Sequence, residues 1–453
     1  MTEINDTICA ISTAAGIGGI AVIRVSGNDA ISIVDHLWKG KRLADAESHT
    51  VHYGSIVDAE GNVIDDCVAT IFRNPKSFTG EDVVEISVHG SIYVQKETVN
   101  ALIAAGARLA ERGEFTRRAF AAGKMDLAQA EGVADLIASR SRAAHDIAIK
   151  QMKGGFSQRL SLMHDNLLEL ASLLELELDF SEEDVEFASR QKLLQQAVAL
   201  RNEIQRLAAS FDNGNAIKEG IPVAIIGPTN VGKSSLLNAL VGDDRAIVSN
   251  IHGTTRDLIE DTVTIGNFTF RFIDTAGIRD TDDTIERLGI DRSRQAINRA
   301  TILLQVIDAD NPQKVDYLDN IAENQHLITV INKTDIADSQ QARAIISYTA
   351  TIVEVSAKTH AGIDQLRTSL TDIAQTVLCD NGDIIVTNAR HHQALINALQ
   401  PIERVIDGLN IGISGDFIAQ DLREVLHHLG SITGKVTTTE ILSTIFARFC
   451  IGK

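Results

Sequence analysis

The hydrophobic positions in residues 1–120 alternate between strand-like and helix-like spacing. Residues 18–27 and 82–90 have the two-residue period of strands, and 91–105 has the spacing of a helix. Residues 51–72 form two such strand runs around the turn AEGN (59–62), which predicts a β-hairpin. We therefore expect an α+β domain at the N-terminus.

Long helices are expected after this domain. Residues 125–211 carry apolar side chains at helical spacing, and no proline occurs between positions 76 and 221. Helical spacing returns in residues 385–449. Two helical stretches are thus predicted, separated by a segment of different character.

That segment, residues 217–378, combines short β-rich runs with helical spacing. Such alternation is typical of βαβ units around a mostly parallel sheet. The runs are VAII (223–226), FTFRFID (268–274), ILLQVID (302–308), LITVIN (327–332) and IVEVSAK (352–358). Because a compact domain can be inserted into another, we expect 121–216 and 379–453 to form one split all-α helical domain around an α/β module.

Composition narrows the class of protein. The 453 residues carry 42 Lys and Arg against 61 Asp and Glu, a formal charge of −19, which disfavours unspecific coating of nucleic acid. Residues 108–159 oppose this balance with ten basic and six acidic side chains, and form either a phosphate-binding surface or a solvated helix face. No signal peptide is apparent, and no apolar run is long enough to cross a membrane.

The four cysteines lie far apart and form no C-x-x-C pair. A disulfide framework or a zinc cluster is therefore not expected. Reduced thiols and the absence of a targeting signal favour a cytoplasmic protein.

The segment GPTNVGKS (227–234) follows the run at 223–226 and precedes a helical stretch. This is the phosphate-binding loop pattern in the strand–loop–helix context that it requires. Glycines permit a tight loop whose N–H groups converge on phosphate oxygens at a helix N-terminus. Lys233 would reach the β- and γ-phosphates, and the Ser234 hydroxyl would ligate Mg²⁺.

Three further motifs select the nucleotide. In DTAG (274–277), Asp274 would hold Mg²⁺ through water and the Gly277 N–H would meet the γ-phosphate. In NKTD (332–335), the Asp335 carboxylate can accept from the two donors on the edge of guanine, and adenine offers no such pair. SAK (356–358) can lie behind the base. In this order, each after a strand, these motifs resemble the Ras-like GTPase superfamily.

HGTTRD (252–257) lies where a switch segment is expected, and Thr255 would complete the coordination of Mg²⁺. The position at which Ras-type enzymes orient water with glutamine is Ile278, which cannot do so. Asn230 could coordinate a monovalent cation beside the phosphates instead. Glu286 could orient the water, or it is simply a solvated loop residue.

Motifs outside the module resemble one family more closely. They are SFTGEDVVE (77–85), RGEFTRRAF (112–120), GKMDLAQAE (123–131), TIERLGI (284–290) and FCIGK (449–453). Together with the inserted P-loop GTPase they are similar to the MnmE (TrmE) family of tRNA-modification GTPases, from residue 4 to the last residue.

This resemblance implies a GTP hydrolase that acts with the flavoprotein MnmG (GidA). The pair would install an aminomethyl or carboxymethylaminomethyl group at C5 of the wobble uridine of certain tRNAs, and FAD would be bound by the partner only. The one-carbon unit would come from a tetrahydrofolate derivative bound by the N-terminal domain, which would also form a homodimer. Potassium-dependent pairing of the GTPase domains would activate hydrolysis.

The resemblance also implies roles for individual residues. Glu286 would be catalytic, Ser234 and Thr255 would bind Mg²⁺, and K⁺ would be held by Asn230, Ser249, Ile251 and Thr254. The folate would contact Arg24, Glu81, Lys124 and Lys453; without the resemblance, Arg24 and Glu81 would be taken for ordinary surface charges. The GTP-binding residues would be Gly227, Asn230, Val231, Gly232, Lys233, Ser234, Ser235, Ser249, Asn250, Ile251, His252, Gly253, Thr254, Thr255, Asp274, Thr275, Ala276, Gly277, Asn332, Lys333, Asp335, Ser356, Ala357 and Lys358.

Two alternatives stay open at this point. Cys450 is either a nucleophile near the folate or a small buried residue that packs the last helix. The chain as a whole is either this enzyme or a ribosome- or RNA-associated switch GTPase with no role in modification chemistry. The GTPase motifs do not separate these functions, whereas the flanking motifs favour the enzyme.

Overall fold

The structure is a computed structural model in which residues 6–179, 190–242, 261–273, 296–313, 321–322, 325–346, 351–378, 384–447, 449 and 452 are described. The chain forms two compact units. The first contains residues 1–134, 151–164 and 429–453, and the second contains residues 135–150 and 165–428. The four-part division predicted from the sequence stays a prediction.

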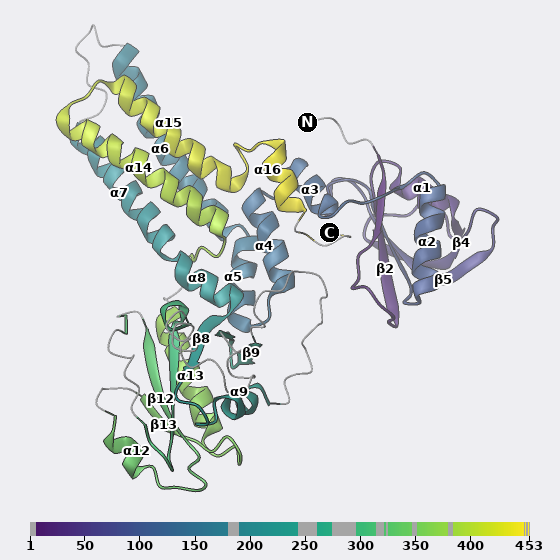
Figure 1. Ribbon diagram of the computed structural model, residues 1–453. Coiled ribbons are helices and arrows are strands. Elements are labelled where there is room, and N and C mark those ends of the chain that lie inside the picture. The colour runs from purple at the N-terminus through teal and green to yellow at the C-terminus, as the bar shows by residue number, and fades with distance from the viewer. Residues whose placement is uncertain are drawn as a thin grey trace. The chain divides into compact units, whose positions relative to one another are not determined.

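The first unit contains a seven-stranded sheet in the order β3-β4-β5-β6-β2-β1-β7 (Figure 1). Neighbouring strands are antiparallel except for β1 and β7, which are parallel. The strands are β1 Ile8–Ile11, β2 Ile20–Ser26, β3 Trp38–Gly40, β4 Thr50–Val57, β5 Val63–Phe72, β6 Val83–His89 and β7 Arg108–Leu109. The predicted hairpin is β4 and β5, and the predicted α+β class is confirmed.

Alternation along β2 and β6 decides which side chains enter the core. Ile23 and Val25 are buried with Val84 and Ile86, because successive side chains of a strand point to opposite faces. The intervening Arg24 and Glu85 therefore share the other face, where they are register partners. Three helices accompany the sheet: α1 Ala30–His36, α2 Ile92–Ala104 and α3 Glu114–Ala121.

The C-terminal helix of the first unit, α16 Thr439–Phe446, packs near the start of α4, Leu127–Ala138. Phe446 and Phe449 form a buried apolar cluster with Leu127 and Ala130. Gly113 permits this approach, since a Cβ at this position would lie 2.6 Å from the carbonyl oxygen of Phe446. The end of the chain is therefore anchored beside α3.

The second unit contains a six-stranded sheet in the order β13-β12-β11-β8-β10-β9 (Figure 1). All neighbours are parallel except the edge pair β9 and β10. The strands are β8 Ile221–Ile226, β9 Asp261–Ile265, β10 Phe268–Ile273, β11 Ile302–Asp308, β12 His326–Asn332 and β13 Thr351–Glu354. Every residue of β11 is buried, as in a parallel sheet covered on both faces. The predicted α/β class is confirmed.

Helices α8 Phe211–Glu219, α9 Lys233–Val241, α12 Gln340–Ala344 and α13 Ile363–Leu378 accompany this sheet. The remaining helices are α5 Arg142–Met152, α6 Gly155–Asp179, α7 Arg190–Ala209, α14 Ala389–Ile411 and α15 Gly415–Thr433. Although α7 precedes the sheet in the chain and α14 follows it, the two lie side by side (Figure 1). Among the described helices, none is both long and apolar enough to span a membrane.

Candidate functional site

The loop at residues 227–232 joins β8 to α9 at the carboxyl end of the parallel strands. Gly227 and Gly232 have positive φ values of 149° and 93°, and a Cβ on Gly227 would lie 2.5 Å from the Val306 carbonyl oxygen. Asn230 also has a positive φ, 62°. Glycine adopts such angles without steric cost, so the sequence can close the loop around a small anion.

Lys233 extends from the first turn of α9 back over this loop. Its ammonium donates to the carbonyl oxygens of Gly227 at 2.8 Å and Pro228 at 2.7 Å. Burial lowers the pKa of Lys233 below its ordinary value. An anion inside the loop would offset this penalty, because it would stabilise the charged ammonium. Ser234 and Ser235 follow in the same helical turn.

Asn332 connects the phosphate loop to the segment after β13. Its amide Nδ2 donates to the Val231 carbonyl oxygen at 2.9 Å, and its Oδ1 accepts from the Ala357 N–H at 3.1 Å. Both hydrogen bonds are buried. Residues more than 100 positions apart are thus held in one arrangement at the end of the sheet.

Asp335 follows Asn332 by three residues, and the Ser356 side chain orients its carboxylate. The Ser356 hydroxyl donates to its Oδ1 at 2.7 Å, and this hydrogen bond holds the pKa of Asp335 below its ordinary value. The carboxylate therefore stays an ionised acceptor at neutral pH. The structure thus brings together NKTD, SAK and the phosphate loop, as the motifs predicted.

Asp308 is a residue that the motifs did not indicate. It ends β11 and is the register partner of Asn332 on β12. Its carboxylate accepts from the Lys333 ammonium at 2.6 Å. The sequence signal that could have identified Asp308 is its place as an acidic residue at the carboxyl end of a predicted strand. The next predicted strand ends where NKTD begins.

The other predicted members of the nucleotide site lie outside the described residues. These are the catalytic Glu286, the switch and potassium segment Ser249, Asn250, Ile251, His252, Gly253, Thr254 and Thr255, and the DTAG residues Asp274, Thr275, Ala276 and Gly277. Of the predicted metal ligands, Asn230 and Ser234 are described, and both belong to the phosphate loop and the start of α9.

Arg24, a predicted folate residue of the first unit, is not an ordinary surface charge. Arg24 donates from Nε and Nη2 to Glu85 Oε1 at 2.9 and 2.7 Å. Its guanidinium also lies over the rings of Phe78 and Phe115, 5.2 and 5.6 Å from their centroids. This combination fixes the side chain of Arg24 on the polar face of β2.

Glu81 is held by two donors. The Ser26 hydroxyl donates to Oε2 at 2.7 Å, and Arg118 donates to both carboxylate oxygens at 3.1 and 3.3 Å. Lys124 lies close by, since a Cβ on Gly80 would contact its Cε at 3.4 Å. Arg24, Glu81 and Lys124 therefore belong to connected parts of one unit.

The chain end approaches the same sheet. Ser12, which follows β1, donates from its hydroxyl to the Gly452 carbonyl oxygen at 3.0 Å. Lys453 and Cys450 lie outside the described residues, so neither the folate contact of Lys453 nor the two readings of Cys450 is tested. Two other thiols are buried, and burial raises the pKa of Cys9 to about 11 and that of Cys67 to about 12.

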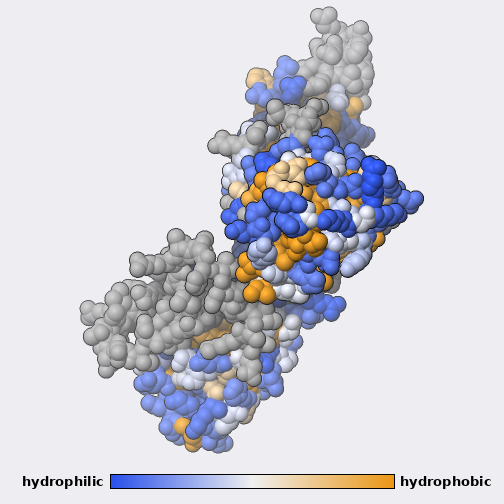
Figure 2. All heavy atoms as spheres, turned by 90° about the vertical axis from the view of Figure 1, so that its right-hand side faces the viewer, coloured by the Kyte–Doolittle hydropathy of each residue, from blue (hydrophilic) through white to orange (hydrophobic). Residues whose placement is uncertain are grey.

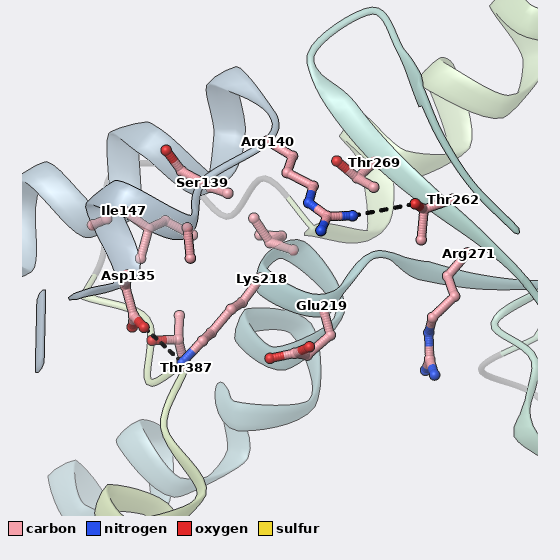
Figure 3. A pocket seen from close by; sticks show the side chains of 14 residues that line it. Asp135, Ser139, Arg140, Ile147, Lys218, Glu219, Thr262, Thr269, Arg271 and Thr387 are labelled. Carbon is pink, nitrogen blue, oxygen red and sulfur yellow. Dashed lines mark hydrogen bonds and ion pairs between the residues drawn. The ribbon is translucent and has the colours of Figure 1, made fainter. Parts of the chain in front are cut away.

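A cavity of about 370 Å³ lies elsewhere in the second unit (Figure 3). Its walls come from the end of α4, the start of α5 and the segment between them, the end of α8, strands β9 and β10, and Thr387. Lys218 pairs with Asp135 at 2.8 Å, and Arg140 donates to Thr262 at 3.4 Å (Figure 3). None of the predicted site residues lines this cavity, so we assign it no part in nucleotide or folate binding.

Two family models together match most of the chain. Residues 7–124 match the family described as the GTP-binding protein TrmE N-terminus, and residues 127–450 match the MnmE helical domain. Among solved structures, the G domain of the T. maritima FeoB iron transporter is 26% identical and covers 34% of this chain and 99% of that chain. Its TM-score of 0.26 is too low to support a conclusion.

Curated relatives match over their whole length. The tRNA modification GTPase MnmE of Parabacteroides distasonis is 50% identical, with 99% of this chain and 100% of that protein covered. The protein of the same name from Porphyromonas gingivalis is 48% identical, with 99% and 98% covered. Matches to two family models and to relatives of equal length show that this chain belongs to the MnmE family.

Proposed function

We propose that this chain is a GTP hydrolase that acts in tRNA modification. In its finer form, the proposal is that the chain works with the flavoprotein MnmG (GidA) to place an aminomethyl or carboxymethylaminomethyl group on C5 of the wobble uridine. The observation that carries the GTPase half is Asn332, which links the phosphate loop to the base-recognition segments. The tRNA half rests on relatives that share about half of their residues with this chain over their full length.

The described nucleotide site fits GTP. The positive φ values of the loop leave N–H groups for phosphate oxygens, and carbonyl oxygens of the same loop hold the half-buried ammonium of Lys233 beside them. Asp335 presents an ionised acceptor for the two donors of guanine. In the proposed site Lys233 stabilises phosphate charge, and Asp335 rejects adenine because its carboxylate would be left unpaired.

Mg²⁺ and K⁺ belong to the same proposal. Ser234 would contribute a hydroxyl to Mg²⁺ with Thr255, and Asn230 would contribute an amide oxygen to K⁺ with Ser249, Ile251 and Thr254. Hard oxygen donors of this type suit both cations. Mg²⁺ supplies positive charge to the phosphates when bound, and Glu286 would orient the attacking water in place of the absent glutamine at Ile278.

The first unit fits a tetrahydrofolate derivative. Arg24 is a guanidinium held over two aromatic rings, and Lys124 is a second cation; both suit the carboxylates of a folate. Glu81 is a carboxylate acceptor that suits the N–H donors of the pterin. The folate supplies the one-carbon unit when bound, and the role of these side chains is to bind and orient it.

A homodimer is supported by apolar surface in the N-terminal domain. Figure 2 shows hydrophobic residues gathered on the face of this domain that is turned to the viewer. Tyr53 of this domain is 74% exposed. The exposed apolar side chains of the domain include Ile17, Ile20, Val51, Tyr53, Val63, Ile92 and Tyr93. Contiguous apolar surface is typical of a protein–protein interface, and we propose a second copy of this chain as its occupant.

Mass spectrometry of the wobble uridines tests the function. Deleting the gene is expected to remove the C5 group, and the intact chain is expected to restore it together with potassium-dependent GTP hydrolysis. Unchanged tRNA modification in the deletion strain would leave the switch GTPase as the better hypothesis. Binding of a folate by the purified chain tests the one-carbon part separately.

A further inference from the structure

A buried network of charges lies behind Glu81. Arg118 on α3 is only 3% exposed, and its Nη2 donates to Asp6 Oδ1 at 2.7 Å and to Glu114 Oε1 at 3.1 Å. Its Nη1 donates to the Asp6 carbonyl oxygen at 2.8 Å and to Glu81. Arg108 completes the network, with donors to Glu114 at 2.7 Å and to Asp6 at 2.6 Å.

Helical geometry presents Arg118 to this network. Glu114 and Arg118 are four residues apart on α3, so both side chains lie on the same face of the helix. Glu114 is fully buried, and the Glu111 N–H and both arginines donate to its carboxylate. This keeps Glu114 in place as an anchor, so that Arg118 has little freedom to turn away from Glu81.

These contacts fix the Glu81 carboxylate but leave it able to accept a further hydrogen bond. Arg118 and Ser26 occupy up to three of the roughly four acceptor positions of a carboxylate. The side chain of Glu81 remains 21% exposed. One acceptor position of the Glu81 carboxylate thus remains for a ligand. Because its two donors, Ser26 and Arg118, are buried, the carboxylate is oriented before any ligand binds.

Charge makes Arg118 essential to this arrangement. Three guanidiniums, of Arg108, Arg117 and Arg118, surround the carboxylates of Asp6, Glu81 and Glu114. Without Arg118, two guanidiniums would face three carboxylates, and of these arginines Arg118 is the one that donates to Glu81. Glu81 would then keep the Ser26 hydroxyl as its side-chain donor, and its carboxylate, which is 21% exposed, would turn toward solvent.

We propose that Arg118 is a positioning residue of the folate site, which orients the Glu81 carboxylate toward the pterin N–H donors without touching the ligand. This inference rests on the proposed folate function and goes beyond it, because the family resemblance implied only Arg24, Glu81, Lys124 and Lys453. Ser26 is the second holder of the same carboxylate.

The test is a calorimetric titration of the full-length protein with 5-formyltetrahydrofolate, a folate that resists oxidation. Arg118→Gln is expected to weaken binding about 10- to 100-fold, since a displaced carboxylate loses its hydrogen-bond geometry. Arg118→Lys keeps the charge but cannot reach all acceptors, so a smaller loss, about 3- to 10-fold, is expected.

Arg108→Gln is the matched control. It removes the Arg108 guanidinium from Asp6 and Glu114 but no contact with Glu81. We expect thermal unfolding to shift for both glutamine variants, while folate affinity in Arg108→Gln stays within about 2-fold of the wild type. Equal losses of affinity in the two glutamine variants would overturn the inference, because network stability alone would then explain both.

Wild-type affinity in Arg118→Gln would also overturn the inference, and would leave the folate function intact. Absence of binding by the wild-type chain, with a normal unfolding transition, would overturn the folate function and the inference together. If Arg118→Gln does not fold, Arg118→Lys against Arg108→Gln decides: an affinity loss confined to the Arg118 variant supports the inference, and equal affinities refute it.

Discussion

Replacing Asn332 with alanine would separate the phosphate loop from the base-recognition segment. The side chain is 2% exposed and makes two buried hydrogen bonds, to the Val231 carbonyl at 2.9 Å and from the Ala357 N–H at 3.1 Å. Alanine removes both and leaves a backbone acceptor and a backbone donor without their partner inside the protein.

The magnitude follows from these two groups. A buried polar group that loses its partner costs about 1–3 kcal/mol, so two such groups cost about 2–4 kcal/mol when some water enters. Binding a nucleotide requires the two loops to be held together. At 1.4 kcal/mol for each factor of ten, affinity for a guanine nucleotide is therefore expected to fall roughly 30- to 700-fold.

Fluorescence titration with N-methylanthraniloyl-GDP measures this loss. Asn388→Ala is the control: Asn388 caps α14 by accepting from the Arg390 N–H, so its loss costs about 1 kcal/mol of stability and no nucleotide affinity. If Asn332→Ala bound within about 3-fold of the wild type, the connection through Asn332 would not organise the site, and the proposed role would be wrong.

Three further predictions concern the chemistry and stability. Hydrolysis should be much faster in K⁺ than in Na⁺, and Glu286→Ala should abolish it while sparing GTP binding; equal rates in both salts at saturating GTP would refute the role of the cation. Asp335→Asn should shift base preference toward xanthine, because it replaces an acceptor with a donor; competition between guanine and xanthine nucleotides would show this. Glu114→Gln should lower stability by about 3 kcal/mol at pH 7. Burial raises the pKa of Glu114, but hydrogen bonds from Arg108, the Glu111 N–H and Arg118 outweigh it and hold the pKa below 4.5. The stabilisation by Glu114 is therefore present above pH 4.5 and lost as pH falls through the folded pKa; urea unfolding at a series of pH values should show a weaker acid dependence in the variant.

Local patterns were sufficient for the elements with strong turn or loop chemistry. The predicted hairpin at 51–72 corresponds to β4 and β5, and the phosphate loop lies between a strand and a helix as its motif required. Period-two alternation and glycine positions act within a few residues, so they can be recognised in sequence.

Other elements were harder to predict from the sequence. The pattern of residues 127–152 predicted one helix, whereas the structure divides it into α4 and α5 at 139–141. The strands β1, β3 and β7 have two to four residues each and carry too little pattern for prediction. Their pairing is decided by the neighbours to which they hydrogen-bond, which the local sequence does not contain.

By itself the sequence determined the family and the order of the motifs, and it predicted the residues of the nucleotide and folate sites. Only the tertiary structure decided which charges are available. Residues 108–159 count as a basic region along the chain, yet Arg108, Arg117 and Arg118 are paired with carboxylates in the fold. Arg118 lies 112 positions from Asp6 and 37 from Glu81. A charge count cannot detect such pairs, because the distance that governs an ion pair is measured in space and is fixed only when helix and sheet pack together.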